Sequence, residues 1–358
     1  MISTPRPVCY LTATLACVTF LFLPSASVGT ESNVYVEPSV LLVNQTLAVP
    51  AGRFASYKLS LKQGTVISAA FTVDGGLDNK VNVLLLDLNN FQRYSSQQQF
   101  SAFKGTAGTI QGIAKYTFKI PETNLYYLLI DNRRSGLFSR NVTIYSFAIL
   151  PEPTDDSLKQ QRGLQTLYQQ LKQLFVFQDF RIALRHCGLE NAFSDRRTGS
   201  ITLCKELAEK LSGQGLSKAM GFVLFHELGH SLLNLWGYPL SDNEDVADEF
   251  ATVFMLLAKQ DDMALEAAHW WASETPRAQK EQAIAKLWQD DRHTLSPQRA
   301  RNIVRWLNQR DALLRQWQKV FVPNMQINAL AALEKSTDNW IDHDLIRSEL
   351  IKRNPAQK

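Results

Sequence analysis

The first half of the chain alternates between short apolar segments and turn-forming residues, which is the pattern of β-strands. Apolar and polar side chains alternate from Tyr57 to Leu61 and from Tyr116 to Ile120, and a period of two residues is that of a strand with one buried face. Glycine, proline and asparagine separate the apolar segments. Predicted strands cover residues 34–43, 57–61, 65–73, 81–88, 116–120, 125–131 and 142–149. Short strands at this spacing predict an antiparallel β-sandwich.

The apolar period changes to that of helices after residues 151–156, a segment with two prolines that is typical of a linker. All seven tryptophans and all six histidines lie in this second half. The pattern therefore predicts a multidomain chain, with an N-terminal antiparallel β-sandwich over residues 30–150 and a mainly α domain over residues 151–358. Helical patterns cover residues 164–175, 264–314 and 325–351.

The first 29 residues have the pattern of a secretory signal peptide. Arg6 precedes a mostly apolar run over residues 8–23, and the small residues Ser25, Ala26 and Ser27 follow it. The run is shorter than the roughly 20 apolar residues of a spanning helix, although a retained membrane anchor is the alternative. The pattern predicts an exported protein, periplasmic or secreted, with no membrane span in its mature chain.

The charge and the cysteine content indicate which binding partners and which cellular compartment to expect for this protein. The 358 residues carry 38 Lys and Arg against 34 Asp and Glu, and the absence of a basic run argues against a nucleic-acid partner. Of the four cysteines, only Cys187 and Cys204 lie outside the predicted signal peptide. Because exported proteins meet oxidising conditions, this pair predicts one disulfide, with two buried free thiols as the alternative.

A motif in the second half carries the strongest chemical signal. His226 and His230 lie four residues apart in an apolar helical stretch, so both imidazoles share one helix face and can bind one Zn²⁺. Glu227 follows the first predicted ligand and is the predicted general base, which acts on the zinc-bound water. Two hydrogen-bonded core histidines are the alternative. We expect this helix to be capped at Ser217 and to end at Gly237.

Glu244 and Asp248 lie one turn apart at the predicted start of the next helix. Ser241 or Asp242 can cap that helix. A catalytic zinc site usually has three protein ligands, so we predict Glu244 as the third ligand, with Asp248 as a hydrogen-bond partner of a ligand imidazole.

The acidic cluster leaves other interpretations open. Negative charge at a helix N-terminus complements the helix dipole without any metal. Asp245 and Glu249 are competing candidates for the third ligand, but on a helix Asp245 is rotated by about 100° and Glu249 by about 140° relative to Glu244.

These motifs resemble those of known peptidases. The sequence His226-Glu-Leu-Gly-His230, followed by Glu244-x-x-Ala247-Asp248-x-Phe250-Ala251, resembles zincins of the gluzincin type. Residues 187–193, 201–207 and 293–302 resemble the DUF4344 family of metallopeptidases, over roughly residues 160–310 in total. The resemblance implies a zincin-like domain with a zinc site. Lys205 stands where that family tends to have tyrosine, and the family's second disulfide has no counterpart here.

Two weaker resemblances complete the picture. His293, in the later segment, is a candidate to stabilise the oxyanion of a tetrahedral intermediate, as a histidine does in several zincins; a capping or core histidine is the alternative. The β-rich half is similar to accessory sandwich domains of secreted bacterial peptidases, and a purely structural sandwich is equally consistent with it.

Together these features predict a zinc-dependent metallopeptidase that acts on a peptide or protein substrate. The alternative is a non-catalytic exported binding or envelope-assembly protein with a structural or vestigial zinc site. A metal-dependent hydrolase of another amide, such as cell-wall material, is a third reading. Glu227 argues against a structural site, since such a site has no use for a base.

Overall fold

The computed structural model describes residues 32–76, 78–103, 108–285 and 297–354, with side chains omitted over 274–285. The chain forms two compact units. One unit is Glu37–Ser157, and the other combines the segment that ends at Val36 with the chain from Leu158 onward. The predicted signal peptide lies outside the described residues.

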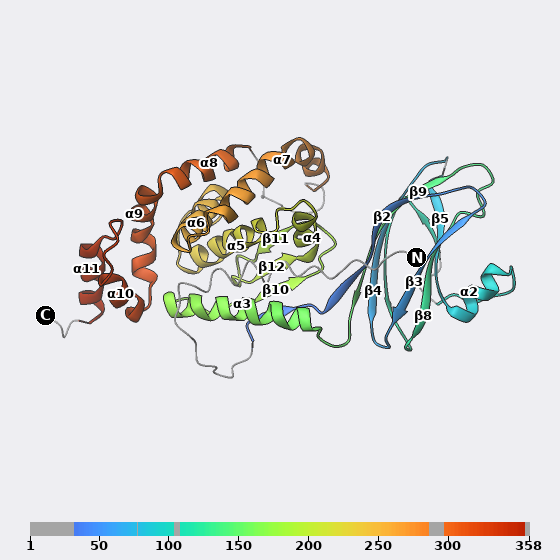
Figure 1. The fold of residues 1–358 in the computed structure, drawn as a ribbon, viewed down its shortest axis with the longest axis horizontal. Helices are drawn as coiled ribbons and strands as arrows, with labels where there is room; N and C mark the ends of the chain where they lie inside the picture. The colour runs from blue at the N-terminus through green and yellow to red at the C-terminus, as the bar shows by residue number, and fades with distance from the viewer. Residues whose placement is uncertain (1–31, 77, 104–107, 286–296, 355–358) are drawn as a thin grey trace. The chain divides into compact units, whose positions relative to one another are not determined.

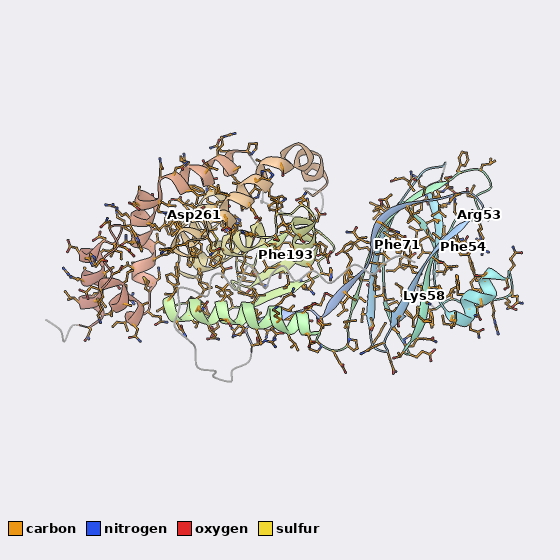
Figure 2. The ribbon with its side chains drawn as sticks, in the orientation of Figure 1. Arg53, Phe54, Lys58, Phe71, Phe193 and Asp261 are labelled. Atoms are coloured by element: carbon orange, nitrogen blue, oxygen red, sulfur yellow. A yellow bond between two sulfur atoms is a disulfide. The ribbon has the colours of Figure 1, made fainter. Side chains whose placement is uncertain are left out.

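The first unit consists of two four-stranded antiparallel sheets, with strand orders β2-β9-β4-β7 and β3-β8-β5-β6. Apolar side chains from both sheets form a single hydrophobic cluster, and Phe71 of β4 is among its most buried members (Figure 2). The two sheets lie face to face in Figure 1, which confirms the predicted β-rich N-terminal part. The strands are β2 (Ser39–Val49), β3 (Phe54–Leu61), β4 (Val66–Asp74), β5 (Lys80–Asp87), β6 (Gly108–Gln111), β7 (Ile113–Lys119), β8 (Asn124–Asp131) and β9 (Arg140–Ile149).

Three local features of this unit differ from the sequence prediction. The strand expected over 34–43 is interrupted at Pro38, which has no N–H for a sheet ladder. Asn89 and Asn90 follow the strand expected over 81–88, but they lie in the first turn of helix α2 (Leu88–Ser95), where the Asp87 side chain accepts a hydrogen bond from the Asn90 N–H. Strand β6 lacks a clear alternating pattern and was not predicted.

The second unit contains a small mixed sheet with the strand order β1-β10-β12-β11. Strand β1 (Val34–Val36) pairs in parallel with β10 (Ile182–Arg185), which pairs in parallel with β12 (Ile201–Cys204). Strand β11 (Ala192–Ser194) is antiparallel and forms one edge. Because β1 precedes the sandwich in the chain, the sandwich is an insertion between β1 and the rest of the second unit.

Helices make up the remainder of the second unit, as predicted. Helix α5 is almost entirely buried, and it ends where Gly237 adopts a left-handed φ of 71°. In Figure 1, α3 runs beside the small sheet. In the described part of the chain, no helix has the length and apolar character needed to cross a membrane. The helices are α3 (Asp155–Leu174), α4 (Lys205–Gly213), α5 (Ala219–Leu235), α6 (Glu244–Leu257), α7 (Asp261–Ala285), α8 (Pro297–Asn308), α9 (Arg310–Phe321), η2 (Val322–Asn324), α10 (Ile327–Glu334) and α11 (His343–Arg353).

The predicted disulfide between Cys187 and Cys204 is present, with the two Cα atoms 5.4 Å apart. It joins the segment after β10 to the start of α4. The buried Glu206 carboxylate lies beside this bridge and accepts hydrogen bonds from the backbone N–H groups of Cys187 and Gly188. His186, which is also buried, lies with Nδ1 3.4 Å from the same carboxylate. The bridge therefore closes a loop that is already held by polar contacts.

Removing the disulfide is expected to lower the free energy of unfolding. The bridge spans 17 residues, and the chain-entropy model assigns about 3 kcal/mol to a loop of that length. The double variant Cys187→Ser/Cys204→Ser should therefore unfold at lower denaturant concentration than the parent protein. Thiol titration of the denatured, unreduced parent should find neither cysteine free. Two titratable thiols would contradict the bridge.

A cut in the segment 151–154 is expected to leave the two fragments associated. The N-terminal fragment keeps β1, whose Val34 and Val36 are buried in the hydrophobic cluster of the second unit. Asn33 also donates hydrogen bonds to the Tyr168 hydroxyl and the Phe180 carbonyl. Size-exclusion chromatography after limited proteolysis should show one peak in native buffer and two in denaturant. Two native peaks would show that β1 contributes little.

Candidate metal centre

Helices α5 and α6 pack closely where the predicted zinc ligands lie. A Cβ atom at Gly229 would be 3.2 Å from the Phe250 ring and 3.3 Å from the Cα atom of Ala247. Glycine at this position therefore allows the two helices to approach each other between His226 and His230. The close approach brings the start of α6 next to the imidazoles of α5.

The side chains of His226, His230 and Glu244 converge on one point. The two Nε2 atoms lie 3.2 Å apart. Glu244 Oε2 lies 3.2 Å from His226 Nε2, and Glu244 Oε1 lies 3.4 Å from His230 Nε2. Two ligand atoms of a tetrahedral zinc ion are about 3.3–3.4 Å apart, given bond lengths of roughly 2.0–2.1 Å. These three residues could therefore hold a metal ion.

The Nδ1 atom of each imidazole lies next to a hydrogen-bond acceptor. His226 Nδ1 lies 2.8 Å from Asp248 Oδ1, and His230 Nδ1 lies 2.7 Å from the Ser241 carbonyl oxygen. Because both partners are acceptors, each Nδ1 carries the hydrogen and each Nε2 presents a lone pair. Two lone pairs that face each other at 3.2 Å repel unless a cation or a proton lies between them. The donor set therefore fits a metal ion.

The charges around His226 also favour a cation. Burial lowers the pKa of His226, but the hydrogen bonds and charges of Asp248 and Glu244 outweigh burial and raise it to about 9. Burial raises the pKa of Asp248, whereas Arg299 and His226 lower it to a net value below the usual range for aspartate. In the metal-free protein, a proton therefore competes for the position that a metal would take.

The helix caps differ from those predicted. Helix α5 begins at Ala219 after Lys218, so Ser217 is not its N-cap. The N-cap of α6 is Asn243, whose side chain accepts a hydrogen bond from the Val246 N–H, rather than Ser241 or Asp242. Ser, Asp and Asn are nearly equivalent as caps, so the sequence alone could not choose among three adjacent candidates.

The two competing candidates for the third ligand, Asp245 and Glu249, form hydrogen bonds with other residues. Asp245 Oδ1 accepts a hydrogen bond from Asn302 Nδ2, and Glu249 Oε1 accepts one from Gln316 Nε2. Of the acidic residues at the start of α6, only Glu244 joins the two histidines in the group that could hold a metal.

Of the two predicted catalytic residues, the structure describes only Glu227. Glu227 lies next to His226 on α5 and is 1% exposed. His293 lies outside the described residues, so its predicted role stays a prediction.

One residue of the centre was not predicted. Arg299 of α8 is 4% exposed, and its Nε and Nη2 lie 2.6 and 2.7 Å from the two carboxylate oxygens of Asp248. A signal for it exists in the sequence, because Arg299 falls on the helical stripe that also contains the buried Ile303 and Trp306. A charged residue at such a position needs a buried partner.

A known protein family matches the part of the chain that contains this site. Residues 151–312 match the model of the DUF4344 family, whose description is "Putative metallopeptidase". No curated protein matches the chain. Among solved structures, the chain is similar to PliG of Aeromonas hydrophila, a periplasmic inhibitor of g-type lysozyme. The two chains are 13% identical over 32% of this chain and 96% of PliG, and a TM-score of 0.20 does not establish a shared fold. Residues 151–312, which include the three side chains that could hold a metal ion, match the DUF4344 family.

Proposed function

We propose that the second unit is a zinc-dependent metallopeptidase that hydrolyses peptide bonds. The observation that carries this proposal is the triangle of His226 Nε2, His230 Nε2 and a Glu244 carboxylate, with both Nδ1 atoms bonded to acceptors. The description of the DUF4344 family supports the same class of enzyme. The disulfide supports export, because such bridges persist in oxidising compartments.

In this proposal His226, His230 and Glu244 hold the zinc ion. When bound, zinc polarises the scissile carbonyl and makes water more acidic. Asp248 and the Ser241 carbonyl hold the two imidazoles in the tautomer that keeps each Nε2 free for the metal.

Glu227 is proposed as the general base. It takes a proton from the attacking water as the bond between the water oxygen and the carbonyl carbon forms. It then gives that proton to the leaving amine as the carbon–nitrogen bond breaks. Glu227 is buried on α5 and directly follows His226, which is proposed as a metal ligand. His293 is proposed to stabilise the oxyanion.

The small sheet offers a place for an extended peptide. Strand β11, which carries Phe193 (Figure 2), is one of the two edge strands of its sheet and contacts α5. An extended peptide can add to such an edge through main-chain hydrogen bonds. This arrangement supports a peptide substrate that binds beside α5, the helix that carries His226 and His230.

The purified protein should therefore hydrolyse casein, and a chelator should abolish the hydrolysis until zinc is restored. Peptidoglycan is the comparison substrate, because cell-wall amides are the main alternative. Hydrolysis of peptidoglycan alone would reassign the substrate class. A protein that binds zinc but cleaves neither substrate would favour a non-catalytic binding or envelope-assembly role.

A further inference from the structure

We propose that Arg299 is a positioning residue of the metal centre, which fixes the Glu244 and Asp248 carboxylates relative to each other. This inference rests on the proposed function, since it assumes that Glu244 is a metal ligand. Arg299 lies on α8, whereas His226 and His230 lie on α5 and Glu244 lies on α6.

The contacts of Arg299 use three of its nitrogen atoms. Nε and Nη2 face the two oxygens of Asp248 at 2.6 and 2.7 Å, and Nη1 lies 3.2 Å from Glu244 Oε2. Asp248 is completely buried, and the Arg299 side chain is 5% exposed. A planar guanidinium that binds one carboxylate through two parallel hydrogen bonds fixes its plane as well as its position.

The same oxygens contact His226. Asp248 Oδ1 lies 2.8 Å from His226 Nδ1, and Glu244 Oε2 lies 3.2 Å from His226 Nε2. Arg299 therefore touches the partner on each side of this imidazole. A shift of the guanidinium would move the acceptor that orients the ring and also the carboxylate that completes the ligand set.

An aromatic ring restricts the movement of Arg299. Its Cζ lies 4.5 Å from the centre of the Trp271 ring, and the His226 ring lies 6.4 Å from the same indole. A cation over an aromatic face is stabilised by that face. Lysine keeps the charge but offers neither the planar fork nor the flat contact.

The test compares the zinc affinity of Arg299→Lys with that of the parent protein by competition with a chelator. We expect the affinity to fall by about 10–100-fold, which is the usual effect of losing a group that orients a metal ligand. The absorption spectrum of the cobalt-loaded protein should also change, because the ligand geometry changes. The matched control is Arg353→Lys, since the Arg353 guanidinium also uses three nitrogen atoms, one on Glu349 and two on backbone carbonyls, in a different segment. It should leave both measurements unchanged.

The outcomes separate the two proposals. A parent protein that binds no zinc contradicts the proposed function. Parent-level zinc affinity and an unchanged cobalt spectrum in folded Arg299→Lys overturn the role of Arg299 and leave the proposed function intact. If circular dichroism shows that Arg299→Lys is unfolded, the double variant Asp248→Asn/Arg299→Gln removes both charges together. Its zinc affinity should fall at least as far, and an affinity equal to that of the parent overturns the inference.

Discussion

Replacing Glu227 with glutamine should lower the rate of peptide hydrolysis by about 10²–10⁴-fold, the range typical of losing a general base. Glutamine has nearly the same size and keeps the helix intact, but it cannot take a proton from water. Zinc content should stay at the parent level, because Glu227 is not one of the three converging ligands. Metal analysis and kcat measured on the same preparation would separate catalysis from metal binding.

Glu249→Gln is the matched control for this experiment. Glu249 lies on α6 and hydrogen-bonds to Gln316 instead of facing the histidines. This variant should keep both zinc and activity. Full activity in Glu227→Gln would show that the proposed mechanism is wrong.

Replacing Glu244 with alanine should remove zinc as well as activity. Glu244 supplies the carboxylate within 3.2–3.4 Å of both Nε2 atoms, so its loss leaves two imidazole ligands where catalytic zinc usually has three protein ligands. The loss of affinity should exceed the roughly 10–100-fold that follows from removing a partner of a ligand. Zinc per protein, measured by mass spectrometry after dialysis, is the readout.

The neighbouring variants Asp245→Ala and Glu249→Ala serve as controls in the same assay. Each removes a carboxylate from α6, but these carboxylates hydrogen-bond to Asn302 and Gln316. Both variants should retain zinc. If either one lost zinc and Glu244→Ala kept it, the assignment of the third ligand would be wrong.

The features that could be predicted from the sequence depend on local spacing. Two histidines four residues apart share a helix face whatever the rest of the fold does, and the structure places His226 and His230 accordingly. The prediction of Glu244 required only that the next helix start near it, so the wrong prediction of the N-cap of that helix did not affect it. The disulfide followed from there being two cysteines outside the predicted signal peptide.

The features that could not be predicted depend on contacts between distant segments. Arg299 lies 51 residues from Asp248, and nothing within its own helix indicates which carboxylate it meets. Helix α2 depends on the Asp87 side chain as its cap, in a segment whose asparagines also suit a turn. The parallel pairing of β1 with β10 joins residues on either side of an entire sandwich, and local periodicity carries no information about it.

That pairing has a consequence for the order in which the protein folds. Val34 and Ile182 are partners in the sheet, so β1 leaves the ribosome long before the strand that it joins. The intervening sandwich has its own hydrophobic cluster and can fold before β10 is available to pair with β1. A folded sandwich also shortens the effective loop between the two strands, which reduces the entropy lost when they pair. Mutations that slow folding of the sandwich should therefore delay assembly of the metal centre, although His226, His230 and Glu244 all lie in the other unit.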